Sequence, residues 1–377
     1  MPLTEETRPF VDAMKKAYEY LLKKQGPQMS QPQPQPDQHI QQHISTTEPQ
    51  PPESPVHHQP QMQLQAFTEG ITNQLMGCYV GSLTEGPVLL VRVYGQMTEL
   101  FLDRDKEMQM FQVLHKHGCG PELYCSFTNG ICYEFVRGVV LDDTLLRRPS
   151  VYRLIATEMG KIHSIKPGEV GDSSPVTPVL WSRLSQFLNL VQRSDAAKQQ
   201  RPHEETPSLK IIIREMEELK THLTHISSPV VLCHNDLLTK NVIYNQEEGT
   251  VKFIDYEYAD FNYQAYDIGN HFNEFAGVSD VDSSLYPSRE LQFDWLTAYL
   301  ESFKSCSGVD SAVTKKELLE LYVQVCKFSL AAHLFWCLWA LLQAKHSTID
   351  FDFKRYSRAR FNYYFEKKQE FIGLRLP

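Results

Sequence analysis

The sequence predicts an α+β protein, with a strand-rich segment before residue 138 and a longer helical segment after it. Short apolar runs bounded by turn residues, which are typical of strands, are concentrated in the first segment. Apolar residues at helical spacing dominate the second, where two short apolar strands are each followed by an aspartate. The chain has 377 residues, 42% of them hydrophobic and 22% charged, so it can form one large or two smaller domains with a sizeable core.

Residues 1–25 and 26–65 precede the predicted globular part. Residues 1–25 include PFVDAMKKAYEYLLKK, whose apolar residues recur at helical spacing and predict a short helix. Residues 26–65 are rich in Pro and Gln and contain few apolar side chains. Such a segment cannot bury enough surface to offset its chain entropy, so we expect a disordered linker. A docking tract for a partner protein is the alternative.

Residues 66–138 are predicted to form a small strand-rich lobe. LMGCYVG and PVLLVRVYG are typical of strands, and the turn-rich SLTEG between them indicates a hairpin. DRDKEMQMFQVLHKHG predicts a helix that ends at Gly118. ELYCSFTNGICYEFV predicts a second hairpin that turns at Asn129-Gly130.

Residues 139–377 are predicted to form a larger, mainly helical lobe. Its only predicted strands are Val230–Cys233 and Val251–Ile254, which the segment NQEEG would join in a hairpin-like pair. The apolar stretch 328–342 is short for a membrane span and contains His333, so it predicts a buried helix and no membrane span. Helices are predicted at residues 150–165, 179–193, 208–225, 289–304, 314–345 and 353–370.

Charge and cysteine usage exclude some classes of protein. The net charge of -9 argues against a nucleic-acid binder, which usually has a basic face. The eight cysteines are scattered without a C-x-x-C pair or metal-like spacing, and the start MPLTEETRPF is polar. These features predict a cytoplasmic protein without structural disulfides.

Three polar side chains follow the two predicted strands. Asp236 lies on the loop after the first strand, Asn241 follows five residues later, and Asp255 comes directly after the second strand. A carboxylate that can orient a hydroxyl, beside an amide and a carboxylate that can hold Mg²⁺, is typical of phosphoryl transfer. A helix or turn cap is the alternative for Asp236 alone. The three residues together favour catalysis.

H-x-D-x-x-x-x-N followed by I-D-Y-E-Y is similar to the signature of the choline/ethanolamine kinase family, which is related to the aminoglycoside phosphotransferases. The resemblance runs from about Phe67 to the C-terminus and implies a two-lobed protein-kinase-like fold. FTEGITNQL, HNDLLTKN and FIDYEYADFNYQAYDIGNHFNEFAGV look most like the ethanolamine-phosphorylating branch. Choline kinases usually carry Gln two residues after the catalytic aspartate, where this chain has Leu238.

The resemblance implies ATP-dependent phosphorylation of ethanolamine to phosphoethanolamine, the first step of the CDP-ethanolamine route to phosphatidylethanolamine. ATP is then a co-substrate and Mg²⁺ a cofactor. A choline kinase or dual choline/ethanolamine kinase is the nearest alternative, followed by an aminoglycoside phosphotransferase. A ligand-binding pseudoenzyme and a scaffold that acts through the Pro/Gln tract are alternatives of other classes. Some relatives dimerise, so the resemblance allows a homodimer.

The resemblance also implies the roles of individual residues. Asp236 becomes the catalytic aspartate, Asn241 and Asp255 the Mg²⁺ ligands, and His234 and Asn235 supports of the catalytic loop. Arg92, in the middle of a strand, resembles the phosphate-contacting basic residue, with Glu107 as its ion-pair partner; a solvent-facing arginine is the alternative. The residues expected to contact ATP are Gly70, Thr72, Asn73, Arg92, Glu107, Glu134 and Phe135.

The acceptor pocket is expected to hold a small cationic amine. Trp336 and Trp339 lie three residues apart on one predicted helix, where a pair of core tryptophans is the alternative. The matching aromatic residues of choline kinases form a cation–π box. The residues expected to contact the amine are Glu274, Trp336, Trp339, Phe351 and Tyr356, with Glu274 supplying negative charge.

Overall fold

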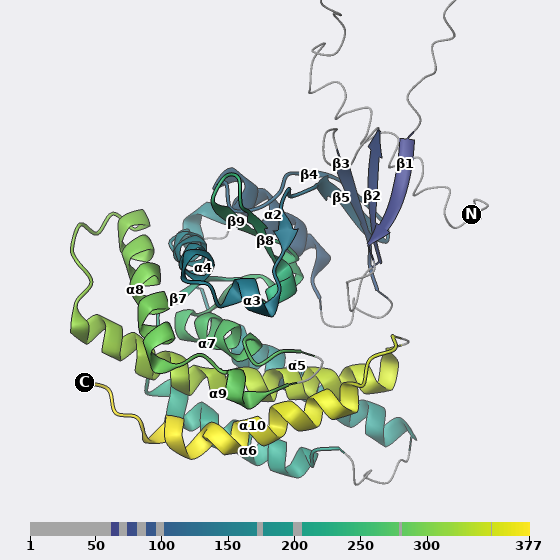
Figure 1. Cartoon of the computed structure of the whole chain (residues 1–377). Coiled ribbons are helices and arrows are strands. Elements are labelled where there is room, and N and C mark those ends of the chain that lie inside the picture. The colour runs from purple at the N-terminus through teal and green to yellow at the C-terminus, as the bar shows by residue number, and fades with distance from the viewer. Residues whose placement is uncertain are drawn as a thin grey trace, which may run out of the picture. The chain divides into compact units, whose positions relative to one another are not determined.

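A computed structural model describes residues 62–67, 74–80, 88–95, 102–171, 176–198, 206–278, 281–347 and 349–377 of the chain. The described residues divide into two compact units (Figure 1). The smaller unit consists of residues up to Val93 together with Tyr124–Phe135, and the larger consists of Tyr94–Leu123 and Val136–Pro377. The predicted N-terminal helix and most of the predicted linker lie outside the described residues, as do Gly70, Thr72 and Asn73.

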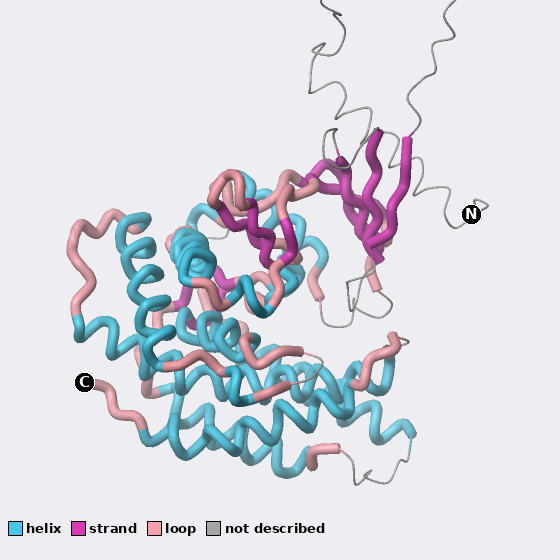
Figure 2. The backbone as a smooth tube through the Cα atoms, in the orientation of Figure 1, coloured by secondary structure: helices cyan, strands magenta, loops and turns pink. Residues whose placement is uncertain are grey.

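The smaller unit is one five-stranded sheet with the strand order β1-β2-β3-β5-β4 (Figure 2). Its antiparallel register places Cys78 opposite Leu89 and Val91 opposite Cys132, and these four side chains form a buried cluster. The strand pairs of both predicted hairpins are confirmed, but the second hairpin turns at Thr128-Asn129, one residue before the predicted Asn129-Gly130, and the predicted SLTEG turn of the first lies outside the described residues. The strands are β1 Met62–Phe67, β2 Gln74–Val80, β3 Val88–Val93, β4 Leu123–Phe127 and β5 Gly130–Glu134.

The start of β1 corrects the predicted end of the linker. β1 begins at Met62 and pairs with β2 along its whole length, so the expected disordered segment 26–65 is wrong over its last four residues. Residues 63–66 are exposed. The strand is therefore held by backbone hydrogen bonds to β2, which a polar composition does not reveal.

Helix α2, Arg104–Lys116, confirms the predicted helix before Gly118. The side chain of Asp103 caps its first turn by accepting from the backbone N–H of Lys106, and Gly118 adopts a φ of 67° after its last turn. The helix belongs to the larger unit and not to the predicted lobe 66–138, because its buried face packs there. The ring of Phe111 meets the ring of Tyr256 at 6.4 Å between centroids.

Helices dominate the larger unit, as the sequence predicts. The six helices predicted after residue 139 are confirmed, with shifts of a few residues at their ends. The long helix α9 packs against α10, α7 and α5, while α4 packs against α8 (Figure 1). The helices are α3 Asp143–Leu146, α4 Pro149–His163, α5 Leu180–Lys198, α6 Leu209–Thr224, α7 Gln264–Glu274, α8 Arg289–Cys306, α9 Lys315–His346 and α10 Phe353–Gly373.

Helices α7 and α9 form the centre of this unit. All residues of α7 are buried, including its polar side chains, so it has no solvent-exposed face; the sequence analysis did not predict this helix. Helix α9 is long and apolar enough to cross a membrane, but 94% of its most apolar window is buried inside the protein. This burial agrees with the expected core helix.

Five short strands in the larger unit correct the predicted pairing of the two acid-following strands. β7, Val230–Cys233, pairs with β10, Asp260–Tyr263. β9, Thr250–Phe253, pairs with β8, Val242–Asn245, which also pairs with β6, Val139–Val140. The NQEEG turn therefore joins β8 to β9, and β7 and β9 do not form a hairpin. β8 and β10 each have four residues, too few for their period to be recognised in the sequence.

Candidate active site

The loop between β7 and β8 carries Asp236 and turns sharply at Asn235. Asn235 has a φ of 64°, a left-handed conformation that asparagine tolerates better than most residues. Its side-chain Nδ2 donates to the carbonyl oxygens of Tyr258 and Asp260, at 3.0 and 3.2 Å. Asn262 Nδ2 donates to Asn235 Oδ1 at 2.8 Å. The buried amide therefore fixes the turn that presents Asp236.

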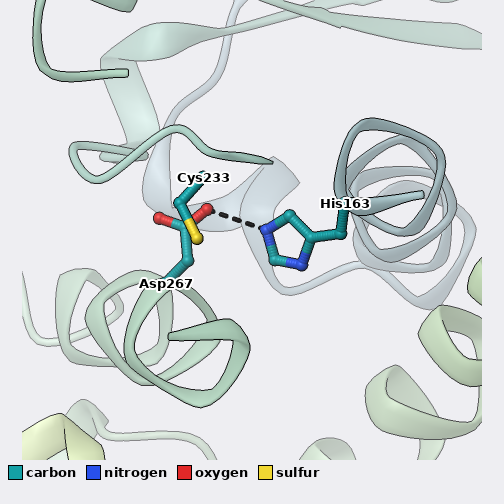
Figure 3. A group of neighbouring side chains, drawn as sticks. All are labelled: His163, Cys233 and Asp267. Atoms are coloured by element: carbon teal, nitrogen blue, oxygen red, sulfur yellow. Dashed lines mark hydrogen bonds and ion pairs between the residues drawn. The ribbon is translucent and has the colours of Figure 1, made fainter. Parts of the chain in front are cut away.

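Asp267, in the first turn of α7, anchors this turn and also faces His163 (Figure 3). Its Oδ1 accepts from the backbone N–H of Asn235 at 2.7 Å, and its Oδ2 accepts from that of His234 at 2.9 Å. His163 Nε2 lies 3.0 Å from Oδ2, and its Nδ1 lies 2.8 Å from the hydroxyl of Tyr299. Burial acts to raise the pKa of Asp267, but the hydrogen bond and charge of His163 and the backbone hydrogen bond from His234 outweigh it and lower the pKa.

Sequence reasoning did not identify Asp267. An aspartate inside a helix whose other residues are buried must be satisfied by several donors, so YDIGNHF contained a usable signal once α7 was recognised. Cys233 lies beside it, and the ligand atoms of His163, Cys233 and Asp267 are within 4.8 Å of one another (Figure 3). Three hydrogen bonds already engage the carboxylate, and burial raises the pKa of the Cys233 thiol. This group supports the loop and is not suited to hold a metal ion.

His234 joins the two loops that follow β7 and β9. Its Nε2 donates to the carbonyl oxygen of Ile254 at 3.0 Å, and its Nδ1 accepts from the backbone N–H of Asp236 at 3.3 Å. Burial lowers the pKa of the imidazole, which favours the neutral form that these two bonds require. The geometry suits the support role expected of His234 and Asn235.

Asn241 and Asp255 lie on the two loops that His234 connects. Asn241 Nδ2 donates to the backbone carbonyl of Asp236 at 2.9 Å. The backbone carbonyl of Asn241 accepts from the backbone N–H of Ile254 at 3.0 Å. Asp255 follows with a left-handed φ of 63°. The hydrogen bond of Nδ2 orients the amide and leaves Oδ1 as the amide atom that could bind a metal ion. An amide oxygen and a carboxylate are hard donors, so the residues present fit Mg²⁺.

Asp236 itself is half-buried in an acidic environment. Burial raises its pKa, the charges of Asp255, Glu274 and Glu257 raise it further, and Arg360 acts in the opposite direction. No described residue donates a hydrogen bond to its carboxylate. The group is therefore able to accept a proton, in contrast to the saturated carboxylate of Asp267.

The structure brings the predicted amine-binding aromatic residues together. The rings of Trp336 and Trp339 meet edge-on at 5.5 Å between centroids, and Trp339 meets Tyr356 at 6.4 Å. Phe351 extends the cluster, 5.8 Å from Tyr356. Tyr258, which sequence reasoning did not identify, accepts from Trp339 Nε1 at 2.9 Å and meets the Trp336 ring at 5.6 Å.

Hydrogen bonds hold these aromatic residues in fixed orientations beside the acids. Trp336 Nε1 donates to Asn270 Oδ1 at 2.7 Å. Burial raises the pKa of the Tyr356 hydroxyl, and the charges of Glu274 and Asp236 raise it further. Tyr356 is therefore within electrostatic reach of both carboxylates, although the tryptophans, 5 and 7% exposed, also serve the core.

Glu274 ends α7 and is not an isolated carboxylate. Arg360 Nη1, on α10, donates to Glu274 Oε1 at 3.1 Å, and both side chains are buried. Burial raises the pKa of Glu274, and Arg360 opposes that shift through its charge and hydrogen bond. Sequence reasoning did not identify Arg360, because an arginine in the polar-looking YSRARFNYYF gives no sign of burial.

The predicted nucleotide residues are divided between the two units. Arg92 on β3 is 3% exposed, which contradicts the solvent-facing alternative, and its guanidinium lies 6.0 Å from the Tyr133 ring. Glu134 ends β5, and Phe135 stacks on Phe67 at 6.2 Å. Glu107 belongs to the larger unit and accepts from Arg104 at 2.7 Å. The pairing of Arg92 with Glu107 and the position of the nucleotide stay predictions.

Comparison with known proteins shows which protein family this chain resembles. Residues 64–365 match the model of the choline/ethanolamine kinase family. Ethanolamine kinase 1 of Homo sapiens is 52% identical over 318 residues, covering 83% of this chain and 69% of that protein. Ethanolamine kinase 2 of Homo sapiens is 50% identical over 317 residues, covering 84% of this chain and 79% of that protein.

Comparison with solved structures supports the predicted fold. Plasmodium vivax ethanolamine kinase superposes with a TM-score of 0.70 at 27% identity, covering 82% of this chain and 84% of that one. Cryptosporidium parvum choline kinase gives a TM-score of 0.70 at 23% identity, covering 83% of this chain and 90% of that one. The predicted protein-kinase-like fold, with a sheet-based N-terminal lobe and a helical C-terminal lobe, is confirmed.

Proposed function

This chain belongs to the choline/ethanolamine kinase family, and we propose that it transfers the γ-phosphoryl group of ATP to the hydroxyl of ethanolamine. The products are phosphoethanolamine and ADP, the first of which enters the CDP-ethanolamine route to phosphatidylethanolamine. The observation that carries the proposal is the juxtaposition of Asp236 with Asn241 and Asp255 on two loops joined by His234. The similarity to proteins named ethanolamine kinases supports the choice of substrate.

Asp236 is the group that acts on the acceptor hydroxyl. Its carboxylate would accept or orient the hydroxyl proton while the oxygen attacks the γ-phosphorus, and its raised pKa favours proton acceptance. Asn235 and Asp267 hold its backbone in place, so little reorganisation is needed when substrate binds.

Asn241 and Asp255 are proposed to hold Mg²⁺ through Asn241 Oδ1 and the Asp255 carboxylate. When bound, the ion would neutralise charge on the phosphates of ATP. The role of these two residues is to fix its position relative to Asp236, to which Asn241 is tied by a hydrogen bond of 2.9 Å.

The amine end of the substrate is proposed to lie between the aromatic cluster and Glu274. Aromatic faces attract an ammonium group of any substitution, whereas a carboxylate oxygen also accepts hydrogen bonds from a primary ammonium. Choline remains the second candidate because Trp336, Trp339, Phe351 and Tyr356 form a continuous aromatic wall. A pocket that depends on Glu274 for hydrogen bonding would favour ethanolamine.

A substrate panel tests the proposal directly. Purified protein with Mg-ATP is given ethanolamine, choline or an aminoglycoside, and ADP release is measured; then ethanolamine and choline compete at equal concentration. We expect phosphoethanolamine to be the main product. If phosphocholine dominates, the choline-kinase alternative replaces the proposal, and if no substrate releases ADP, the kinase proposal fails.

We further propose that the protein is cytoplasmic. All eight cysteines carry free thiols, including the buried Cys78, Cys132 and Cys233, which is compatible with a reducing compartment. Cell fractionation followed by detection of the protein tests this location, and recovery in a secreted or membrane-enclosed fraction would contradict it.

A further inference from the structure

Arg360 is buried at the amine end of the candidate active site. The residue is 0% exposed and lies on α10. Its Nη1 donates to Glu274 Oε1 at 3.1 Å, and its guanidinium carbon lies 5.6 Å from the centre of the Tyr356 ring. No described residue accepts a hydrogen bond from its Nε or Nη2. The guanidinium is therefore held by one carboxylate and one aromatic face, both of which belong to the proposed amine pocket.

The charge of Arg360 acts on Glu274. A buried carboxylate without a cationic partner becomes neutral, because burial penalises the charged form. A neutral Glu274 would not attract an ammonium group. The salt bridge to Arg360 opposes this neutralisation and fixes the side chain through Oε1.

The second oxygen of Glu274, Oε2, is the one that can accept a hydrogen bond from the substrate. A carboxylate has acceptor capacity on both oxygens, and no described residue donates to Oε2. Arg360 also places a positive charge beside the pocket, which repels every cationic amine. A primary ammonium offsets that repulsion by donating to Oε2, whereas a quaternary ammonium has no N–H to donate.

We propose that Arg360 is a positioning residue that keeps Glu274 ionised and oriented by Oε1, so that Oε2 accepts a hydrogen bond from the primary ammonium of the substrate. Through this contact Arg360 selects ethanolamine over its quaternary analogue. The inference rests on the proposed function, because it assigns a role within the same acceptor site.

Substitution of Arg360 tests the proposal, because the proposal predicts a larger change in KM for ethanolamine than in KM for choline. Arg360→Met should raise KM for ethanolamine about 10- to 100-fold, the range of a hydrogen bond to a charged group. KM for choline and KM for ATP should change less than about threefold. Arg360→Lys, which keeps the charge, should recover most of the ethanolamine affinity. Arg358→Met, an exposed position on the same helix, is the matched control and should leave all three constants unchanged.

A double substitution distinguishes an effect of Arg360 that acts through Glu274 from a general disturbance of the pocket. In a Glu274→Gln background, Arg360→Met should add less than about threefold to KM for ethanolamine, because the carboxylate through which Arg360 acts is gone. The proposal is overturned if Arg360→Met raises KM for ethanolamine and choline equally, or if its effect persists undiminished in the Glu274→Gln protein.

A second comparison applies if Arg360→Met does not fold. Arg360→Gln keeps N–H donors without the charge, so ethanolamine binding measured by calorimetry should be weaker in Arg360→Gln than in Arg360→Lys. Equal affinities overturn the proposal. Failure of the proposed function is recognised separately: wild-type protein that does not phosphorylate ethanolamine rejects that function and this inference together. Wild-type turnover with an unchanged KM in Arg360→Met rejects the inference alone.

Discussion

Asp236 lies on the turn that Asp267 anchors, yet the two carboxylates differ in the hydrogen-bond donors and the charges that surround them. Asp267 faces two backbone N–H groups and the imidazole of His163, which lower its pKa despite burial. Asp236 faces the acids Asp255, Glu257 and Glu274, and burial together with these charges raises its pKa. A carboxylate saturated by donors stabilises structure, whereas one surrounded by acids is available for a proton, a metal-bound phosphate or a cationic substrate.

Substitution of the two proposed metal ligands gives the largest expected effect. Asp255→Asn should reduce Mg-ATP-dependent turnover below detection because it removes the negative charge of the proposed carboxylate ligand, and Asn241→Ala should weaken turnover because it removes a hard oxygen donor. Asn is chosen at position 255 because it tolerates the left-handed φ of 63°, so strain does not confuse the result. Turnover is measured across a Mg²⁺ titration. If both variants reproduce the wild-type titration, the metal assignment is wrong.

Asp236→Asn tests whether the carboxylate of Asp236 accepts the proton of the substrate hydroxyl. The shape is kept while the proton acceptor is lost, so kcat should fall about 10²- to 10⁴-fold. Nucleotide affinity and the melting temperature should stay near wild type, because no described residue donates to this carboxylate. Near-normal kcat would remove Asp236 from the mechanism.

Asp267→Asn should instead reduce stability. The amide replaces one of the two accepting oxygens by an NH2 group, so at least one buried N–H donor loses its acceptor, and we expect a loss of about 3 kcal/mol in the free energy of unfolding at pH 7. Urea titration measures this loss, with the exposed Asp310→Asn as control. A melting temperature equal to wild type would show that the anchoring role is wrong.

The pH dependence of that stability sharpens the same comparison. The pKa of Asp267 is lowered in the folded protein, so its contribution is present above the unfolded value of about 3.9 and is lost as pH falls through the folded pKa. The difference in unfolding free energy between wild type and Asp267→Asn should therefore be constant near neutral pH and shrink below about pH 4. A difference that stays constant at lower pH would contradict an ionised Asp267.

The smallest expected effects concern the amine pocket. Glu274→Gln should lower kcat/KM for ethanolamine about 10- to 100-fold, at least as much as Arg360→Met, and affect choline less, because only the primary ammonium donates to the carboxylate. Trp336→Leu should lower both, and choline relatively more, since aromatic contact is worth about 0.5–2 kcal/mol to a cation. Kinetics with each amine measure the two ratios. Equal losses for both amines in both variants would contradict this division of roles.

The sequence predicted the polar residues around Asp236, but it did not predict the strand pairing and the hydrogen bonds that hold them in place. Asp236 and Asp255 follow short apolar strands and Asn241 comes five residues after Asp236, and this local pattern predicted that the three residues act together. The strand pairing behind it was wrong, because β7 pairs with β10 and β9 with β8. The two loops meet through hydrogen bonds of His234 and Asn241, which join residues from separate strands.

The sequence by itself determined the order of most strands and helices, the chemistry available to the three polar residues and most of the aromatic residues of the proposed amine pocket. These properties depend on residue type and on short-range periodicity, which a chain displays before it folds. Only the tertiary structure decided that Asp267 anchors the catalytic turn, that Arg360 pairs with Glu274 and that β1 begins at Met62. Each of these depends on which distant residue satisfies a buried charge or a backbone edge, and that partner is selected by packing and not by sequence neighbours.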